Sequence, residues 1–176
     1  SGTRGAALVL ALMAVALLAA LGLSLAVLTS VEMRVAANYS HAQEAMSAAE
    51  TALELAVREL LAIADWREVT DGSVRSRFVD GPPDGVRSPG DGIFLNLTEL
   101  TAGLGDPGWR LFAYSPLSRL EGLPSNAYVV VWAGPDPAGR EGVIALRADA
   151  LGPSGSRRAV RAAVSRQGVL SWEDVR

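Results

Sequence analysis

The apolar and polar positions of the chain divide it into unlike halves, and the first begins with an unbroken apolar stretch. Residues 5–31 carry no charge; Arg4 precedes them and Glu32 follows them. About 20 apolar residues in a helix match the thickness of a bilayer core. A cleaved secretory signal has a shorter apolar core, and a buried core helix rarely stays apolar on every face. The stretch therefore predicts a transmembrane helix over residues 6–31.

The same helix is predicted to continue into an amphipathic segment, residues 32–66. No proline interrupts residues 6–64. Apolar positions recur at alternating intervals of four and three residues, the period of a helix lying along another element. These positions are Val35, Tyr39, Ala42, Met46, Ala49, Leu53, Ala56, Leu60 and Ile63. Residues 6–64 are thus predicted as one rod of about 90 Å, half of it in lipid and half in water.

The remainder of the chain is predicted to form a small antiparallel β-sheet head. Residues 67–125 are rich in Gly, Pro and Asp turn signals, which indicates a loop-rich αβ region. Residues 126–176 show cleaner strand patterns: residues 127–133 are a β-branched and aromatic run, whereas 142–151 and 157–166 alternate apolar and polar positions and resemble a hairpin in a sheet with one buried face. The runs with strand character are 93–97, 109–114, 127–133, 142–151 and 157–166. The predicted fold class is α+β, with the amphipathic half of the helix packed on the sheet.

Composition gives no sign of catalytic chemistry. The formal net charge of −3 implies no general attraction to nucleic acid, and the absence of Cys excludes disulfides and thiolate sites. His41 is the only histidine, and it stands off the apolar positions in a charged stretch, where we expect it to be solvated. No acidic cluster has metal-ligand spacing. We therefore predict no metal, no cofactor and no enzymatic activity.

Three short motifs surround the apolar stretch. They are Gly5-Ala6-Ala7-Leu8, Glu32-Met33-Arg34-Val35-Ala36-Ala37-Asn38 and Ala48-Ala49-Glu50-Thr51-Ala52-Leu53. At this spacing they resemble the N-terminal region of PilX-like minor pilins, within the type IV pilin superfamily. The resemblance covers residue 4 to about residue 60. It implies a type IV pilin-like fold and the role of a filament subunit.

The resemblance also implies a processing site and a set of partners. A prepilin peptidase would cut between Gly5 and Ala6, so residues 1–5 would be the end of a leader, with more residues expected before Ser1. Further partners would be other pilins, minor pilins and the inner-membrane assembly platform. The chain would cross the bacterial inner membrane once, with Arg4 on the cytoplasmic side and the head in the periplasm, and would be extracellular after assembly. The positions implied in assembly are Leu10, Gly22, Glu32, Arg34, Asn38 and Glu50.

Leu10 departs from the pattern of the major pilins. In those proteins a Glu five residues into the mature chain sets the register against a neighbouring subunit, and the counted position here is Leu10. Its absence suits a subunit of the priming or tip complex. Three alternatives remain open: a K-type pseudopilin of type II secretion, a single-pass anchored binding module that never polymerises, and an anchored enzyme.

Overall fold

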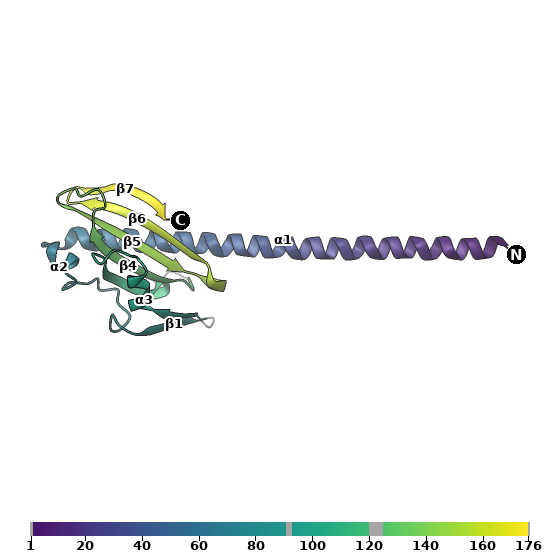
Figure 1. Ribbon diagram of the computed structural model, residues 1–176, viewed down its shortest axis with the longest axis horizontal. Coiled ribbons are helices and arrows are strands. Elements are labelled where there is room, and N and C mark those ends of the chain that lie inside the picture. The colour runs from purple at the N-terminus through teal and green to yellow at the C-terminus, as the bar shows by residue number, and fades with distance from the viewer. Residues whose placement is uncertain (1, 91–92, 120–124, 176) are drawn as a thin grey trace. The chain divides into compact units, whose positions relative to one another are not determined.

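The computed structural model describes residues 2–90, 93–119 and 125–175 (Figure 1). The chain divides into two compact units, Ser1–Ser40 and His41–Arg176. The described part of the first unit is helical throughout, and the second unit contains the strands. One long N-terminal helix is followed by antiparallel sheets, so the predicted α+β class is confirmed.

Helix α1 runs from Gly2 to Ala62 without interruption. Ala and Leu, which dominate its sequence, have high helix propensities, and the segment contains no proline. Gly22 in its interior costs only about 1 kcal/mol relative to Ala. The helix tightens at its end, where the Ile63 N–H donates to the Leu60 carbonyl at 3.1 Å.

The part of α1 in the second unit buries a face composed of short and branched apolar side chains. The buried residues are Ala45, Ala48, Ala49, Ala52, Leu53, Leu55, Ala56, Val57 and Leu60. This face includes the later predicted positions, but it is wider than the single predicted line because alanine lets flanking residues approach the sheet. At the beginning of the predicted line, Val35 and Tyr39 are 63% and 73% exposed, so the buried face does not extend to them.

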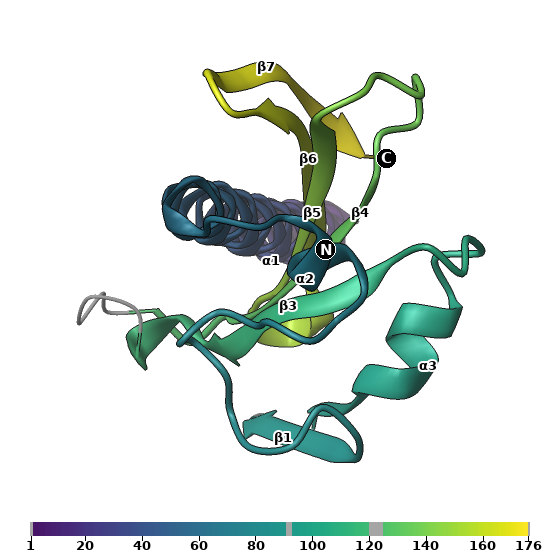
Figure 2. The ribbon, with the colours of Figure 1, turned by 90° about the vertical axis from the view of Figure 1, so that its left-hand side faces the viewer.

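Five antiparallel strands form the main sheet in the order in which they follow along the chain (Figure 2). They are β3 (Arg110–Pro116), β4 (Tyr128–Pro135), β5 (Val143–Leu151), β6 (Arg157–Ser165) and β7 (Gly168–Val175). The predicted hairpin is β5–β6, which pairs from Val143 opposite Ser165 to Leu151 opposite Arg157. Strand β7, which the sequence reasoning did not identify, extends the sheet by one strand.

One face of this sheet packs against α1. Side chains such as Val131 on β4, Leu146 on β5 and Val160 on β6 form one buried cluster with the alanine-rich face of the helix. Facing residues of paired strands lie on the same side of a sheet, which places Ala133, Leu146 and Ala162 in one row on this face. The expected packing of the amphipathic helix on the sheet is therefore confirmed.

The second face of the sheet is also covered, contrary to the expectation of a half-buried sheet. Tyr114, Tyr128 and Trp132 lie on it and are each no more than 1% exposed. They cluster with Leu95 and Leu97, which belong to the loop-rich region. Leu95 on β2 (Ile93–Asn96) and Leu97 on α3 (Leu97–Ala102) thus form a second layer, and β1 (Val86–Gly90) pairs with β2. The other short elements are α2 (Arg67–Thr70) and the 3-10 turns η1 (Leu117–Arg119) and, after β5, η2 (Pro153–Gly155). Val69 of α2 and Leu117 of η1 belong to the cluster on the α1 face.

The two edges of the sheet differ. Along β3 the segment 76–80 supplies backbone partners: the Ser76 N–H donates to the Phe112 carbonyl at 2.9 Å and the Tyr114 N–H to the Phe78 carbonyl at 2.9 Å. Beyond β7 no described strand continues the sheet. Residues 169–174 of β7 are exposed whichever face they lie on.

The end of α1 is held by a residue of the β6–β7 connection. The guanidinium of Arg166, just after β6, donates to the carbonyls of Ile63 and Ala64 at 2.6 and 2.5 Å. It also lies 4.2 Å from the centre of the Trp66 ring, and the Trp66 indole N–H donates to the Leu60 carbonyl at 2.7 Å. These donors satisfy carbonyls that a helix end leaves without partners, and the cation suits the negative end of the helix dipole.

Replacing Arg166 by Ala should lower the free energy of unfolding of the head by about 1 kcal/mol, because the helix-end carbonyls lose a charged donor. Lys should restore only part of the loss, since it lacks the guanidinium fork. Urea unfolding of the full-length chain in detergent, followed by Trp fluorescence, measures the change. Arg158→Ala is the matched control on β6, because among the described residues that side chain donates only to the carbonyl of its neighbour Arg157. Equal effects of the two Ala variants would contradict the anchoring role of Arg166.

Candidate functional site

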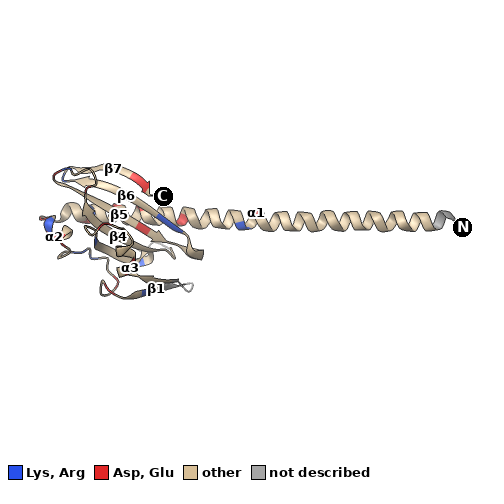
Figure 3. Cartoon of the chain, viewed as in Figure 1, with Lys and Arg blue, Asp and Glu red and all other residues tan. Residues whose placement is uncertain are grey.

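The first candidate site is the apolar surface of α1 in the unit Ser1–Ser40. Leu10, Leu17 and Leu21 are 65–67% exposed, as are their apolar neighbours to a similar degree. No charged residue occurs between Arg4 and Glu32 in the sequence, and Figure 3 draws this length of the helix in tan. Each large apolar side chain left in water forgoes about 1.5–3 kcal/mol of burial free energy. Such a surface requires an apolar environment.

The length and character of α1 suit a membrane. Among the described residues, one helix is long and apolar enough to cross a bilayer, and none of its 18 most apolar consecutive residues is buried. Its hydroxyl groups are satisfied internally: Ser24 and Thr29 donate to the carbonyls of Ala20 and Leu25 at 2.8 and 3.0 Å. A hydroxyl bonded to the preceding turn presents no unpaired donor to lipid. The apolar N-terminal helix therefore indicates membrane anchoring.

The residues singled out from the sequence all lie on α1. Gly5, Ala6, Leu10, Gly22, Glu32, Arg34 and Asn38 are exposed, and they are spread along one helix, so that Gly5 and Asn38 are about 50 Å apart. Glu50 is half-buried and lies in the part of α1 that packs on the sheet. The structure thus brings none of them together into a compact site.

Neither the backbone conformation nor a close contact within the described residues requires a glycine at position 22. A Cβ atom built at Gly22 meets nothing within 4 Å, and the same holds at Gly5. Neither residue has a positive φ. By contrast, a Cβ at Gly134 would lie 2.7 Å from the Trp109 ring, so that glycine serves the packing of the head. A small residue on an exposed apolar helix permits close approach of another helix in an apolar environment.

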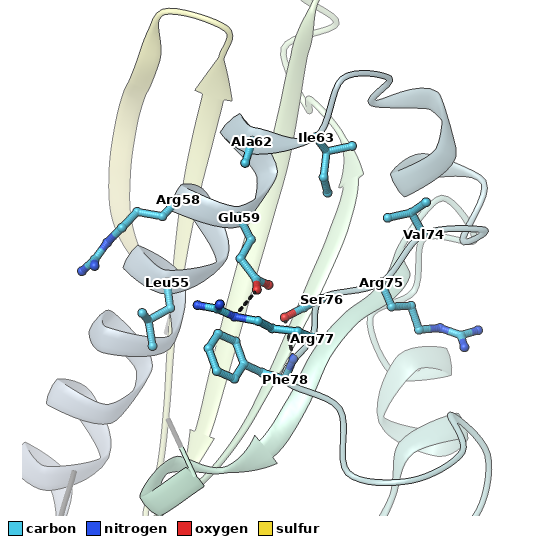
Figure 4. A pocket seen from close by; sticks show the side chains of 10 residues that line it. All are labelled: Leu55, Arg58, Glu59, Ala62, Ile63, Val74, Arg75, Ser76, Arg77 and Phe78. Atoms are coloured by element: carbon cyan, nitrogen blue, oxygen red, sulfur yellow. Dashed lines mark hydrogen bonds and ion pairs between the residues drawn. The ribbon is translucent and has the colours of Figure 1, made fainter. Parts of the chain in front are cut away.

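A pocket of about 410 Å³ in the head is lined by α1 and residues 74–78 (Figure 4). Its wall includes Leu55, Ile63 and Phe78, and Arg77 Nε lies 3.0 Å from Glu59 Oε1. The other carboxylate oxygen of Glu59 is buried without a hydrogen-bond partner among the described residues. The pocket combines apolar and charged groups, a lining suited to binding.

The strongest charge interactions of the head are structural. Asp149 is 1% exposed, and it accepts from Arg147 Nε at 2.8 Å and from Arg157 Nη2 at 2.6 Å. Two hydrogen bonds from the Arg140 side chain lower the pKa of Asp136 to about 2. Burial raises the pKa of Tyr128 to about 12, which keeps the phenol neutral. No group of three His, Cys, Asp or Glu side chains suited to a metal occurs in the described ranges.

His41 is less solvated than the sequence suggested. It is half-buried, and its Nδ1 atom is buried without a hydrogen-bond partner among the described residues. Its carbonyl faces the β5–β6 connection, where a Cβ added at Gly152 would lie 3.7 Å from it. The backbone of His41 thus lies near this connection, which no local sequence pattern specifies.

Two elements that shape the head were missed, although each has a sequence signal. Asn96 caps α3: its Oδ1 accepts from the N–H groups of Thr98 and Glu99 at 3.1 and 3.3 Å, and its Nδ2 donates to Glu99 Oε1 at 2.9 Å. A capping residue followed three positions later by Glu marks a helix start. Strand β7 shows the alternation Leu170, Ser171, Trp172, Glu173, which is typical of a strand.

Comparison with known proteins gave one match. Residues 4–54 match the family model described as PilX N-terminal, and the matched segment is less than a third of the chain. It contains the apolar surface of α1, all the positions singled out on it and the start of the buried helix face. The comparisons with curated proteins and with solved structures gave no match.

Replacing Leu17 and Leu21 by Arg should release the chain from membranes, because two charges near the centre of the span cost about 5–7 kcal/mol together. The measurement is the fraction retained in the membrane pellet after alkaline carbonate extraction. Gln43→Arg with Ser47→Arg is the control, since it adds the same charges at the same spacing on exposed positions of the head unit. Retention of the Leu17→Arg/Leu21→Arg variant would show that another part of the chain anchors it.

Proposed function

We propose, from the match of residues 4–54 to the PilX N-terminal family model, that this chain is a PilX-like type IV pilin. Its role would be that of a minor pilin or pseudopilin of the priming or tip complex of a type IV pilus or related filament. PilX-like pilins are structural proteins, so the chain is a filament subunit rather than an enzyme. Its partners are other pilins and minor pilins, the prepilin peptidase and the inner-membrane assembly platform. It requires no cofactor and no nucleic acid.

The observation that carries this proposal is the exposed apolar surface of α1, together with the continuity of that helix into the buried face of the head. Lipid and a bundle of apolar helices are both apolar environments. Moving the helix from one to the other therefore avoids the cost of exposing apolar surface to water, about 25 cal/mol per Å². Gly22, which meets no atom of its own chain, favours close packing among neighbouring helices in such a bundle.

In this proposal the mature protein begins at Ala6, after cleavage behind Gly5. Before assembly the helix spans the inner membrane once, with Arg4 on the cytoplasmic side and the head in the periplasm. After assembly the head belongs to an extracellular filament. Glu32, Arg34, Asn38 and Glu50 follow the apolar stretch, and we assign them to contacts with neighbouring subunits.

Leu10 supports a place at the end of the filament. A side chain without charge cannot form the ion pair that sets the register of a major pilin against the N-terminus of its neighbour. The N-terminal helix of this chain then has no charged partner to seek in a preceding subunit, which suits the first subunit to be extracted.

Co-expression with a prepilin peptidase should shorten the chain so that its N-terminal residue is Ala6, as read by N-terminal sequencing and intact mass. Gly5→Val should abolish the cleavage, because the resemblance places the cut directly after this glycine. Gly22→Val is the control, since it makes the same substitution within the same helix. An N-terminus that stays upstream of Gly5 in the unaltered chain would favour an anchored binding module that does not polymerise.

A labelled copy should be found at one end of intact filaments. The chain has no Cys, so a single Cys introduced at the exposed Ala138 provides a unique label site for electron microscopy with gold. Leu10→Glu should restore the charged contact and spread the label along the shaft, whereas Leu10→Met should leave it at the end. If the chain with its native Leu10 were labelled uniformly along the filament shafts, the tip assignment would be contradicted.

A further inference from the structure

Among the described residues, the five-stranded sheet has one open edge, and that edge is strand β7. The β3 edge is closed by the chain itself, because segment 76–80 exchanges backbone hydrogen bonds with that strand. Figures 1 and 2 show no described element beyond β7, and no described strand pairs with its outer side. The backbone N–H and C=O groups on that side therefore have no strand partner within the described chain.

Strand β7 is long and only lightly protected against pairing. It has eight residues and contains no proline, lysine or arginine. Proteins usually blunt an exposed edge with short strands, proline, bulges or charge. Here a bulge interrupts the pairing with β6 between Val169 and Ser171, and two carboxylates lie near the end of the strand. From Ser171 to Val175 the pairing with β6 is regular, which leaves a straight edge of backbone for another strand.

The carboxylates of this regular edge lie on different faces of the sheet. Trp172 and Asp174 lie on the face that packs against α1, because their partners on β6 belong to that cluster. Glu173 lies on the other face, opposite Arg161. A strand added beside β7 also places consecutive side chains on alternate faces. Two consecutive residues of an added strand therefore reach both carboxylates.

The charges at this edge favour a basic partner strand. Glu173 lies 3.7 Å from Arg161, yet 61% of its side chain stays exposed. Asp174 is exposed and forms no ion pair within the described residues. Figure 3 shows acidic side chains in red near the C-terminal end of β7. Opposite charges on adjacent strands stabilise a sheet, and so do apolar pairs, which the 38% exposed Trp172 can form.

We propose that β7 accepts, as a sixth strand, an extended segment of a different protein that carries two consecutive basic residues next to an apolar one. A row of free backbone donors and acceptors is complementary to another extended backbone. A second copy does not supply such a strand. The chain has one pair of consecutive basic residues, Arg157 and Arg158, and these lie on β6, which is already paired on both sides.

The strand and the edge belong to different proteins, so this contact forms once and does not repeat along a filament. It suits a subunit at one end. Apolar helix packing is non-directional, and Leu10 supplies no charge to set a register, so pairing of strands in the heads provides the missing register. The inference rests on the proposed function only in identifying the donor of the strand as another pilin.

A labelled peptide of sequence Thr-Val-Arg-Arg-Val-Thr, blocked at both ends, is the probe. Its sequence reads the same in both directions, so it tests parallel and antiparallel addition together. Fluorescence anisotropy measures its binding to the full-length chain in a non-ionic detergent, and hydrogen exchange with mass spectrometry measures protection of the β7 amides. We expect binding that protects β7 and that weakens as the salt concentration rises.

Two control peptides separate charge from backbone pairing. A peptide with both arginines replaced by Glu should bind about fivefold more weakly, because it loses the ion pairs. A peptide methylated on the backbone nitrogens of both arginines should not protect β7, because consecutive N–H groups point to opposite edges of a strand and both edges are then blocked. Asp174→Lys should weaken binding of the original peptide. Glu141→Lys, the same exchange in the exposed β4–β5 connection, should leave it unchanged.

Equal binding of the original and the methylated peptide would overturn the inference, and so would the absence of protection at β7. Dimers of the chain in which β7 is protected without any peptide would also overturn it, because the edge would then pair with a second copy. Peptidase cleavage behind Gly5 is measured on the same chains. Cleavage without peptide binding rejects strand addition and leaves the proposed function intact, whereas binding without cleavage rejects the proposed function alone.

Discussion

The close packing of α1 on the five-stranded sheet is the contact on which the rest of the head depends. Ala48, Ala52 and Ala56 follow one another at intervals of four residues, so they lie on one helix face, and each is at most 3% exposed. Their short side chains let the helix backbone come near the sheet, where Ala148 and Ala162 are equally small. A larger residue at such a position would find no free volume.

This packing determines where the other elements lie. With α1 against one face of the sheet, the strands can be shielded further only from the opposite face, and the second layer of β2 and α3 lies there over Trp132 and Tyr114. The Trp132 indole N–H donates to the Thr101 hydroxyl at 2.9 Å, which joins α3 to the centre of the sheet. The polar atom of the buried ring is thus satisfied by the layer that covers it.

Helix α1 has one part in each unit of the chain, and the two parts lie in opposite physical environments. In the head the helix exchanges water for a specific protein surface, and its sequence there alternates buried alanines with exposed charges such as Glu54 and Arg58. In the unit Ser1–Ser40 the apolar side chains face outward on all sides, and the hydroxyls turn back to the helix itself. The first pattern specifies one partner surface, whereas the second accepts any apolar environment. A filament helix that leaves lipid for neighbouring helices needs that tolerance.

The sequence by itself determined the elements whose signal is local and repetitive. The uncharged stretch, the absence of proline and the alanine-rich periodicity predict α1. A run of β-branched and aromatic residues predicts β4, and alternation predicts β5 and β6. The residues assigned to the site, from Gly5 to Glu50, also come from a linear pattern, which the match to the PilX N-terminal model supports over residues 4–54. The roles proposed for them in processing and assembly concern partners, so no contact within one chain reveals them.

Only the tertiary structure decided which residues from distant parts of the chain meet. Arg166 at the end of α1, the arginines around Asp149 and the pocket near Glu59 each join segments far apart in sequence. The same holds for burial of both sheet faces, because the covering residues come from a loop-rich region with weak local patterns. The physical reason is that hydrogen-bonded periodicity depends on neighbours three or four residues away. Side-chain packing depends instead on how the whole chain closes around its core.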